Sequence, residues 1–419
     1  MSLSARHPST EPHAPSAGVA CTTADTPAGD VAVTAHPAIS WTEARETRTA
    51  RWRSERGAPP PKRVVIADDR MSADAAYHYA CEGTALLWRG DFQNARQLLQ
   101  ALSRRVDRKP RKPRASSSSA GSAASPATAP GDAFHLYRQA QFQRARTLGM
   151  LLIPLADDYR VPLRRAPDVR AACIEAYGPG QERSVTSLRE LLGLIGAHEW
   201  RKTGIAIAAA GGRIHPHYGV FAPVRSEYVG LVAAAPLPAK SLLAFDIGTG
   251  TGVLAAVLAR RGVAHIVATE HDPRALACAR ENIARLDLAG QVEVVAADLF
   301  PEGLATLIVC NPPWIPARPG SAIEHAIYDP DSRMLRGFIG GLAAHLEPGG
   351  EGWLVLSDIA EHLGLRTRDE LLAAFDAAGL KIAGRTEVRP HHPKAADAAD
   401  PLHAARAAEM TSLWRLVAQ

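Results

Sequence analysis

The second half of the chain alternates short apolar runs with amphipathic stretches, and this alternation constrains the possible folds most strongly. The apolar runs predict seven strands at 242–245, 265–269, 292–296, 305–310, 353–357, 381–388 and 410–417. Helical spacing predicts helices at 253–261, 273–286 and 367–378. Strands that alternate with helices of about 10–15 residues form a parallel, doubly wound α/β sheet. We therefore predict such a domain over residues 211–419.

A glycine-rich turn follows the first predicted strand. Its sequence, DIGTGTG, contains five candidate cofactor-binding residues: Asp246, Gly248, Thr249, Gly250 and Gly252. Glycines at a strand-to-helix turn allow a ligand to approach the backbone closely, and the helix N-terminus offers free amide donors. A dinucleotide fingerprint would have glycine where this chain has Val253, so a nicotinamide cofactor is disfavoured but not excluded.

The next two predicted strands are followed by further candidate ligands. Glu270 ends the second strand, where an acid accepts hydrogen bonds from both ribose hydroxyls of an adenosyl ligand, and His271 follows it. After the third strand, Asp298 is placed to accept a hydrogen bond from an adenine amino group, and Leu299 to pack on the ring. NAD and S-adenosylmethionine fit these positions equally well.

A compact motif, Asn311-Pro312-Pro313-Trp314, directly follows the predicted strand 305–310. The two prolines fix the backbone and lack amide donors, so their carbonyls and the Asn311 side chain can face one point. That arrangement suits a planar NH2 group, held by acceptors while its lone pair faces a methyl donor. Trp314 offers an apolar plane for an amide or a base. All four residues are predicted to be catalytic, and Asn311 also to adjoin the cofactor.

Together these motifs resemble the class I S-adenosylmethionine-dependent methyltransferases, in the small-domain group that contains the HemK-type glutamine N5-methyltransferases. DIGTGTG is similar to the acidic-Gly-x-Gly-x-Gly motif of that family, Glu270 to its ribose-binding acid, and NPPW to its N/D-P-P-Y/F/W motif. The resemblance covers residues 219–352. It implies a Rossmann-like seven-stranded sheet, S-adenosyl-L-methionine as cofactor, and N-methylation of a planar amide or exocyclic amine without a metal.

The chain departs from that family at positions where the methyl acceptor is expected. The segment GVFAPVRSEYV keeps the layout of the family's Pro-Arg-Pro-Glu-Thr-Glu-like sequence but not its letters. Phe221, Pro223 and Arg225 are therefore predicted to contact the substrate, together with Trp314. Trp314 replaces the usual tyrosine, and Tyr328-Asp329-Pro330 stands where the family has Glu-Pro. These departures concern the acceptor rather than methyl transfer.

The first half of the chain is predicted to contain a disordered region and a helical domain. Residues 1–40 have five prolines and no aromatic side chain, so they cannot bury enough apolar surface to offset their ordering entropy. We predict disorder over 1–64 and a helical substrate-recognition domain over 65–210, with a flexible basic and Ser/Ala-rich insertion at 104–131. A helical domain before the catalytic domain also resembles the HemK arrangement.

Charge leaves the class of substrate open. Seven cations and one carboxylate give residues 104–114 a charge of +6, against +5 for the whole chain. Such a stretch is a solvated segment or a phosphate-binding arm. The domain order slightly favours a protein glutamine amide, and an RNA or DNA base is the alternative because the same motif serves adenine and guanine amines. A small molecule is a further candidate for the methyl acceptor. Two hypotheses outside methyl transfer are a nicotinamide oxidoreductase and a noncatalytic adaptor.

Composition and residue spacing also argue against a membrane helix, a disulfide scaffold and a metal site. No apolar run reaches the roughly 18–20 residues of a membrane helix, and the five cysteines form no CxxC pair, which argues against a disulfide scaffold or a structural zinc. His391, His392 and His403 have no thiolate or carboxylate at metal-ligand spacing. We predict a cytoplasmic protein with no metal and no membrane contact, and the sequence leaves its oligomeric state open.

Overall fold

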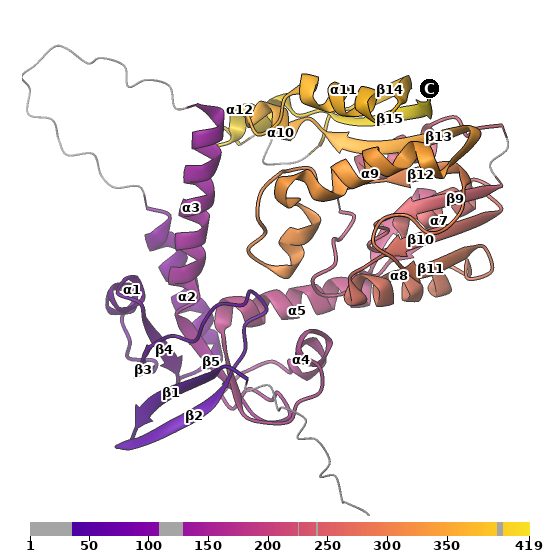
Figure 1. Ribbon diagram of the computed structural model, residues 1–419. Helices are drawn as coiled ribbons and strands as arrows, with labels where there is room; N and C mark the ends of the chain where they lie inside the picture. Colours follow the sequence, from indigo (N-terminus) through magenta and orange to yellow (C-terminus); the bar gives the residue numbers. More distant parts are fainter. Residues whose placement is uncertain (1–35, 109–128, 225, 240–241, 392–396) are drawn as a thin grey trace, which may run out of the picture. The chain divides into compact units, whose positions relative to one another are not determined.

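The computed structural model describes residues 36–108, 129–224, 226–239, 242–391 and 397–419. Residues 37–419 form one compact unit that contains two large β-sheets (Figure 1). Within the described ranges, no helix is long and apolar enough to cross a membrane. The predictions for residues 1–35, most of the basic insertion and Arg225 lie outside the described residues.

The C-terminal sheet has seven strands in the order β11-β10-β9-β12-β13-β15-β14. Their bounds are β9 Leu243–Ile247, β10 His265–Glu270, β11 Val292–Ala296, β12 Ala305–Cys310, β13 Leu346–Ser357, β14 Leu380–Val388 and β15 Thr411–Ala418. The strands from β11 to β13 are parallel, and β15 runs antiparallel between β13 and β14. The predicted α/β sheet is confirmed, including all seven strands.

Chain order reverses between β9 and β12, which are neighbours in the sheet. Val309 lies opposite Asp246, and Cys310 lies opposite Ile247. In an open α/β sheet, ligands bind outside the carboxyl ends of the strands at such a switch point. The glycine turn after β9 and the NPPW motif after β12 therefore begin side by side.

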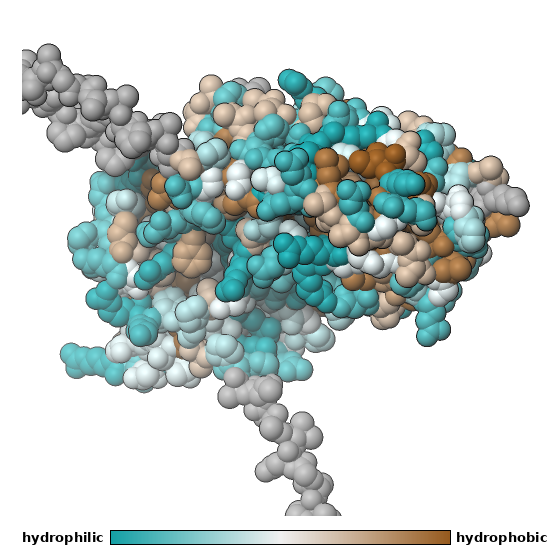
Figure 2. Space-filling model, turned by 45° about the horizontal axis from the view of Figure 1, so that its top comes forward, coloured by the Kyte–Doolittle hydropathy of each residue, from teal (hydrophilic) through white to brown (hydrophobic). Residues whose placement is uncertain are grey.

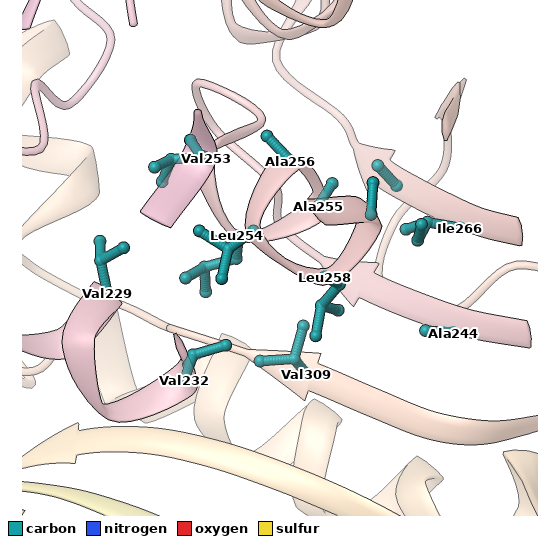
Figure 3. Packing of buried hydrophobic residues seen from close by; sticks show 14 of the residues in the cluster. Val229, Val232, Ala244, Val253, Leu254, Ala255, Ala256, Leu258, Ile266 and Val309 are labelled. Atoms are coloured by element: carbon teal, nitrogen blue, oxygen red, sulfur yellow. The ribbon is translucent and has the colours of Figure 1, made fainter. Parts of the chain in front are cut away.

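Helices cover both faces of this sheet. The bounds are α6 Glu227–Ala234, α7 Val253–Arg260, α8 Pro273–Arg285, α9 Arg333–His345, α10 Ile359–His362, α11 Arg368–Ala377 and α12 His403–Ala408. Figure 3 shows α6 and α7 packing their apolar side chains toward strand residues such as Ala244, Ile266 and Val309. On the opposite face, α9 and α11 pack on Phe245 and Ile308. Alternate residues of β9 and β12 thus feed two separate cores, as the pleat requires.

The N-terminal part of the unit is a mixed α/β domain, so the predicted all-helical domain over 65–210 is wrong. Six strands lie in the order β1-β2-β6-β5-β4-β3. Their bounds are β1 Ala38–Glu43, β2 Glu46–Trp52, β3 Arg63–Ala67, β4 Thr84–Trp88, β5 Leu151–Leu155 and β6 Ser184–Ser187. The helices are α1 Ala73–Cys81, α2 Phe92–Val106, α3 Pro130–Leu148, α4 Arg170–Tyr177 and α5 Leu188–Thr203.

Two short apolar runs account for the error. β4 and β5 are five-residue segments in which every residue is buried, and periodicity alone does not distinguish such a run from a buried helix segment. Leu86 and Leu87 thus belong to β4, within the domain that was predicted to be helical. Gly83, at φ +77°, ends the turn after α1 and allows the chain to enter the sheet.

The predicted disorder over 1–64 is also wrong for its described part. β1 and β2 form an antiparallel hairpin, and Trp52 and Ile39 are buried against the sheet. These strands are exposed along much of their length, so composition gave little sign of them. A small antiparallel pair, β7 Ile205–Ile207 and β8 Gly212–Ile214, then leads into the C-terminal sheet.

Candidate active site

The glycine turn after β9 takes a backbone path that favours glycine. Gly248, Gly250 and Gly252 have φ values of +69°, +58° and +80°. Side chains with a Cβ rarely adopt this left-handed region. The alternation of glycine in DIGTGTG therefore has a direct conformational cause.

Asp246 anchors the turn from below. Its carboxylate is buried and accepts hydrogen bonds from the Thr249 hydroxyl at 2.6 Å and from the Ala255 amide at 3.0 Å. Burial raises the pKa of Asp246 to about 6, because desolvation outweighs these two hydrogen bonds. The side chain thus joins the turn to the first part of α7, and its contact with the cofactor stays a prediction.

The three glycines meet different surroundings. A Cβ on Gly248 would lie against the Met334 side chain of α9, and one on Gly252 would lie 3.5 Å from the Ala279 backbone of α8. A Cβ on Gly250 would meet nothing within 4 Å. The turn therefore has one side that is open to a ligand, at Gly250, and this open side fits the adenosyl cofactor expected there.

Glu270 lies at the end of β10 and faces this open side. Its carboxylate accepts hydrogen bonds from the backbone amides of Gly250 at 3.2 Å, His271 at 2.8 Å and Asp272 at 3.0 Å. A carboxylate has about four lone-pair sites, so acceptor capacity remains for a ribose hydroxyl. The glycine turn and the predicted ribose acid are thus in direct contact.

The loop after β11 carries the other predicted cofactor residues. Leu299 has φ +70°, which is strained for a residue with a branched side chain, and its carbonyl accepts a hydrogen bond from the Thr269 hydroxyl at 2.6 Å. The exposed Asp298 is paired with Arg333. His271 is exposed beside Glu270. The adenine contacts of Asp298 and Leu299 stay predictions.

The NPPW motif begins where β12 ends. The Trp314 indole Nε1–H donates to Asn311 Oδ1 at 2.9 Å. Because an indole N–H only donates, this bond fixes which end of the Asn311 amide is the oxygen. Pro312 is buried, whereas Asn311, Pro313 and Trp314 are half-buried. Trp314 packs against the cores on both faces of the sheet.

The segment after the motif returns to it. Ile315 and Tyr328 form a parallel bridge, and the Asp329 amide donates to the Ile315 carbonyl at 2.9 Å. The buried Asp329 carboxylate accepts from the amides of Met334 and Leu335, both at 3.1 Å, at the start of α9. Burial raises the pKa of Asp329. The residue holds the loop 315–328 beside the motif.

The predicted substrate segment packs against α8 and against the core that includes α7. Val220 packs against Ala275 and Cys278 of α8, and Phe221 packs partly on the core under α7. Pro223 is buried. The Glu227 carboxylate accepts from the His391 amide at 2.7 Å, so this segment contacts the histidine-containing loop.

Two supporting residues were not found by sequence reasoning. Asn282 of α8 is fully buried, donates to the Thr251 carbonyl at 3.0 Å and accepts from the His215 amide at 2.8 Å. Met334 covers Gly248. A polar residue at an apolar helix position, as at Asn282, was the one available signal. Among the described residues, no group of His, Cys, Asp and Glu could hold a metal ion.

Comparison with known families shows what the C-terminal part of the chain is similar to. Residues 211–378 match the family model described as Methyltransferase small domain. The match covers less than half of the chain. The seven-stranded sheet of this part is the Rossmann-like sheet expected from the resemblance, and S-adenosyl-L-methionine stays the cofactor predicted for it.

Three curated relatives illustrate the range of this similarity. A release factor glutamine methyltransferase of Cereibacter sphaeroides is 39% identical over 30% of this chain and 50% of its own length. A ribosomal protein L11 methyltransferase of Sorangium cellulosum is 35% identical over 34% and 37%. A tRNA1(Val) (adenine(37)-N6)-methyltransferase of a Shewanella species is 33% identical over 25% and 46%. The chain thus spans about half the length of these relatives, or less.

Proposed function

We propose that this protein transfers a methyl group from S-adenosyl-L-methionine to the nitrogen of a planar NH2 group held by the NPPW motif. The observation that carries the proposal is the position of Asn311 at the switch point, next to an open glycine turn in contact with Glu270. Methyl donor and acceptor would then meet at the ends of two neighbouring strands.

The cofactor site follows from the turn. Gly250 would leave room for the cofactor, Glu270 would accept from its ribose hydroxyls, and Asp298 and Leu299 would contact its adenine. Bound there, S-adenosyl-L-methionine supplies an electrophilic methyl group. The buried Asp246 and Asn282 hold the turn through their hydrogen bonds to Ala255 and Thr251.

Asn311 and Pro312 would orient the acceptor. An amide or exocyclic amine is a poor nucleophile because its lone pair is delocalised. Asn311 Oδ1 keeps one lone pair beside the Trp314 indole, and with the Pro312 carbonyl it would accept the two N–H bonds of the NH2 group. Holding two reactants in attack geometry can contribute on the order of 7–11 kcal/mol.

Two acceptor classes carry such a group. A protein glutamine amide is the candidate supported by the relatives named for release factors. A base in RNA or DNA is the second candidate, supported by the tRNA-modifying relative and by a group of arginines beside the motif, described below. The cytoplasmic location expected from the sequence stays a prediction.

The direct test is transfer of tritium from labelled S-adenosyl-L-methionine into an extract of cells that lack this gene. The labelled material is then divided between protease and nuclease digestion. Label released by protease identifies a protein acceptor, and label released by nuclease identifies a nucleic acid. Asn311→Ala serves as the control, and equal labelling by this variant would count against the proposal.

A further inference from the structure

Four arginine side chains gather beside the loop that follows the NPPW motif. We call them the arginine cluster: Arg56 after β2, Arg138 and Arg144 on α3, and Arg189 in the first turn of α5. The Glu324 carboxylate in the loop faces two of them, Arg56 and Arg138. It lies 3.9 Å from Arg56 Nη2 and 3.7 Å from Arg138 Nη1.

The arginine cluster carries more positive charge than its carboxylates neutralise. Glu324 also accepts from the Gly320 amide at 2.7 Å, and its contacts to two arginines are longer than a hydrogen bond. Arg144 is paired with Asp107 at 2.7 Å. Burial lowers the pKa of Arg189, and the nearby charges of Arg56 and Arg144 lower it further. Among the residues that the structure describes, only Glu324 and Asp107 form ion pairs with these four guanidinium groups.

Some donors of the cluster are also unused. Arg138 Nη1 and Arg189 Nη1 are shielded from water and have no hydrogen-bond partner in the part of the chain that the structure describes. A buried donor without an acceptor costs about 1–3 kcal/mol. The oxygens of a bound anion would satisfy such donors, and the planar guanidinium fork matches phosphate geometry.

The cluster adjoins the methyl-transfer motif. The Arg138 guanidinium lies 4.0 Å from the centroid of the Tyr328 ring, and it donates to the Arg318 carbonyl at 2.7 Å. Tyr328 bridges to Ile315, the residue after Trp314. Tyr328 and Trp314 pack against the same hydrophobic cluster, which includes Phe134 of α3. An anion at the cluster would therefore lie next to the acceptor site.

Positive charge continues from the cluster along the end of α2. Arg144 donates to Ser103 and Asp107, and the exposed Arg104 and Arg108 belong to the same end. On the face of the molecule seen in Figure 2, hydrophilic side chains cover much of the surface, and apolar side chains gather toward the right of the view. Several guanidinium groups with the Tyr328 ring beside them suit the phosphates of a single strand better than one carboxylate does.

We propose that the arginine cluster binds backbone phosphates of a single-stranded nucleic acid whose base is the methyl acceptor. The part of this inference that concerns methylation of the base rests on the proposed function. Phosphate binding itself is independent of methyl transfer and can be measured without it.

The test is fluorescence anisotropy of the full chain with labelled single-stranded RNA or DNA of about 20 nucleotides, titrated at several salt concentrations. The double variant Arg56→Gln/Arg189→Gln is compared with Arg280→Gln. Arg280 is exposed on α8 and donates to the Val294 carbonyl, outside the cluster. Polyglutamate of equal charge is the competitor, and the RNA and DNA arms show which strand is preferred.

We expect the double variant to bind at least about tenfold more weakly, with the log–log salt slope reduced by about 2, since each lost phosphate contact reduces it by about 1. Arg280→Gln should stay within about twofold of wild type. Unchanged affinity and slope in the double variant would overturn the proposal. Competition by polyglutamate as strong as by unlabelled RNA would assign the cluster to an acidic protein instead.

Cofactor binding separates this inference from the proposed function. If the wild-type chain binds nucleic acid through the cluster but does not bind S-adenosyl-L-methionine in calorimetry, the proposed function fails and phosphate binding stands. If it binds the cofactor and methylates a protein while the variants bind RNA like wild type, the inference fails and methyl transfer stands. Circular dichroism of each variant verifies that it folds.

Discussion

Burial determines the pKa of several side chains in this protein. Asp246 is the clearest of them, because the same carboxylate that shapes the glycine turn is removed from water and has a pKa raised to about 6. Its two hydrogen bonds, from Thr249 and Ala255, favour the charged carboxylate and so limit the rise of its pKa. The cost of that burial should be visible in the stability of the protein.

The stability of wild type relative to Asp246→Asn should depend on pH. Because the folded pKa lies above the ordinary value of 3.8, the proton stabilises the folded state fully below about pH 4, and this contribution is lost as pH rises through about 6. The shift corresponds to about 3 kcal/mol. Urea unfolding of both proteins from pH 4 to 7 should therefore show the variant gaining about that much over wild type. A constant difference would contradict the assignment.

Trp314 should act on the reaction through Asn311. Removing the indole N–H in Trp314→Phe frees the Asn311 amide to turn, so the rate constant of transfer should fall about 3- to 10-fold, the value of one hydrogen bond. The affinity for S-adenosyl-L-methionine should stay within about twofold. Trp41→Phe is the matched control, because its indole also donates one hydrogen bond, to Glu43 at 3.0 Å. Equal loss of activity in both variants would remove the special role of Trp314.

At the scale of single elements, the turn between β9 and α7 combines backbone strain with open space. Gly250→Ala adds a methyl group on the ligand side, so we expect the affinity for S-adenosyl-L-methionine to fall at least about tenfold. Backbone strain should in addition lower the stability of the variant by about 1–2 kcal/mol. Gly349→Ala provides the control, since Gly349 also has positive φ and open space but lies in β13. Calorimetry of both variants measures the difference. Unchanged affinity in Gly250→Ala would place the cofactor elsewhere.

Elements with strong local patterns could be predicted from the sequence. The strands around Asp246 and Asn311 and the helices α7 and α8 lie within two residues of their expected bounds, because apolar runs alternate there with helices and clear turns. β4 and β5 could not be assigned, since a fully buried run of five residues has no period that separates strand from helix. The role of Asp329 could not be predicted either. Its hydrogen bonds to the start of α9 depend on the path of the loop in the folded chain, which no local sequence pattern indicates.

At the scale of the whole molecule, α3 joins the N-terminal part to the part that contains the seven-stranded sheet. Phe134 is 2% exposed and packs with Ile359 and Leu363, whereas Arg138 contacts Tyr328. The helical domain predicted over 65–210 included the segment that forms α3. That the helix would lie beside the NPPW motif depends on contacts between segments nearly 200 residues apart, which no local pattern encodes.

Phe134 should therefore stabilise the unit as a whole. Phe134→Ala is expected to lower the free energy of unfolding by about 3–5 kcal/mol, since it empties a buried site. Phe142→Ala on the same helix is the matched control. Phe142 is 69% exposed, so its loss should change stability by no more than about 0.5 kcal/mol. Similar effects of the two variants in urea unfolding would show that the contact of α3 contributes little.

The central claim is that cofactor binding and acceptor orientation belong to different residues of one site. It is tested most directly by measuring S-adenosyl-L-methionine affinity by calorimetry, and methyl transfer in parallel, for wild type, Glu270→Ala and Asn311→Ala. We predict that Glu270→Ala loses cofactor binding. Asn311→Ala should bind the cofactor within about threefold of wild type yet lose at least about 100-fold in transfer. Equal loss of binding and transfer in Asn311→Ala, or a wild-type chain that binds no cofactor, would contradict the account.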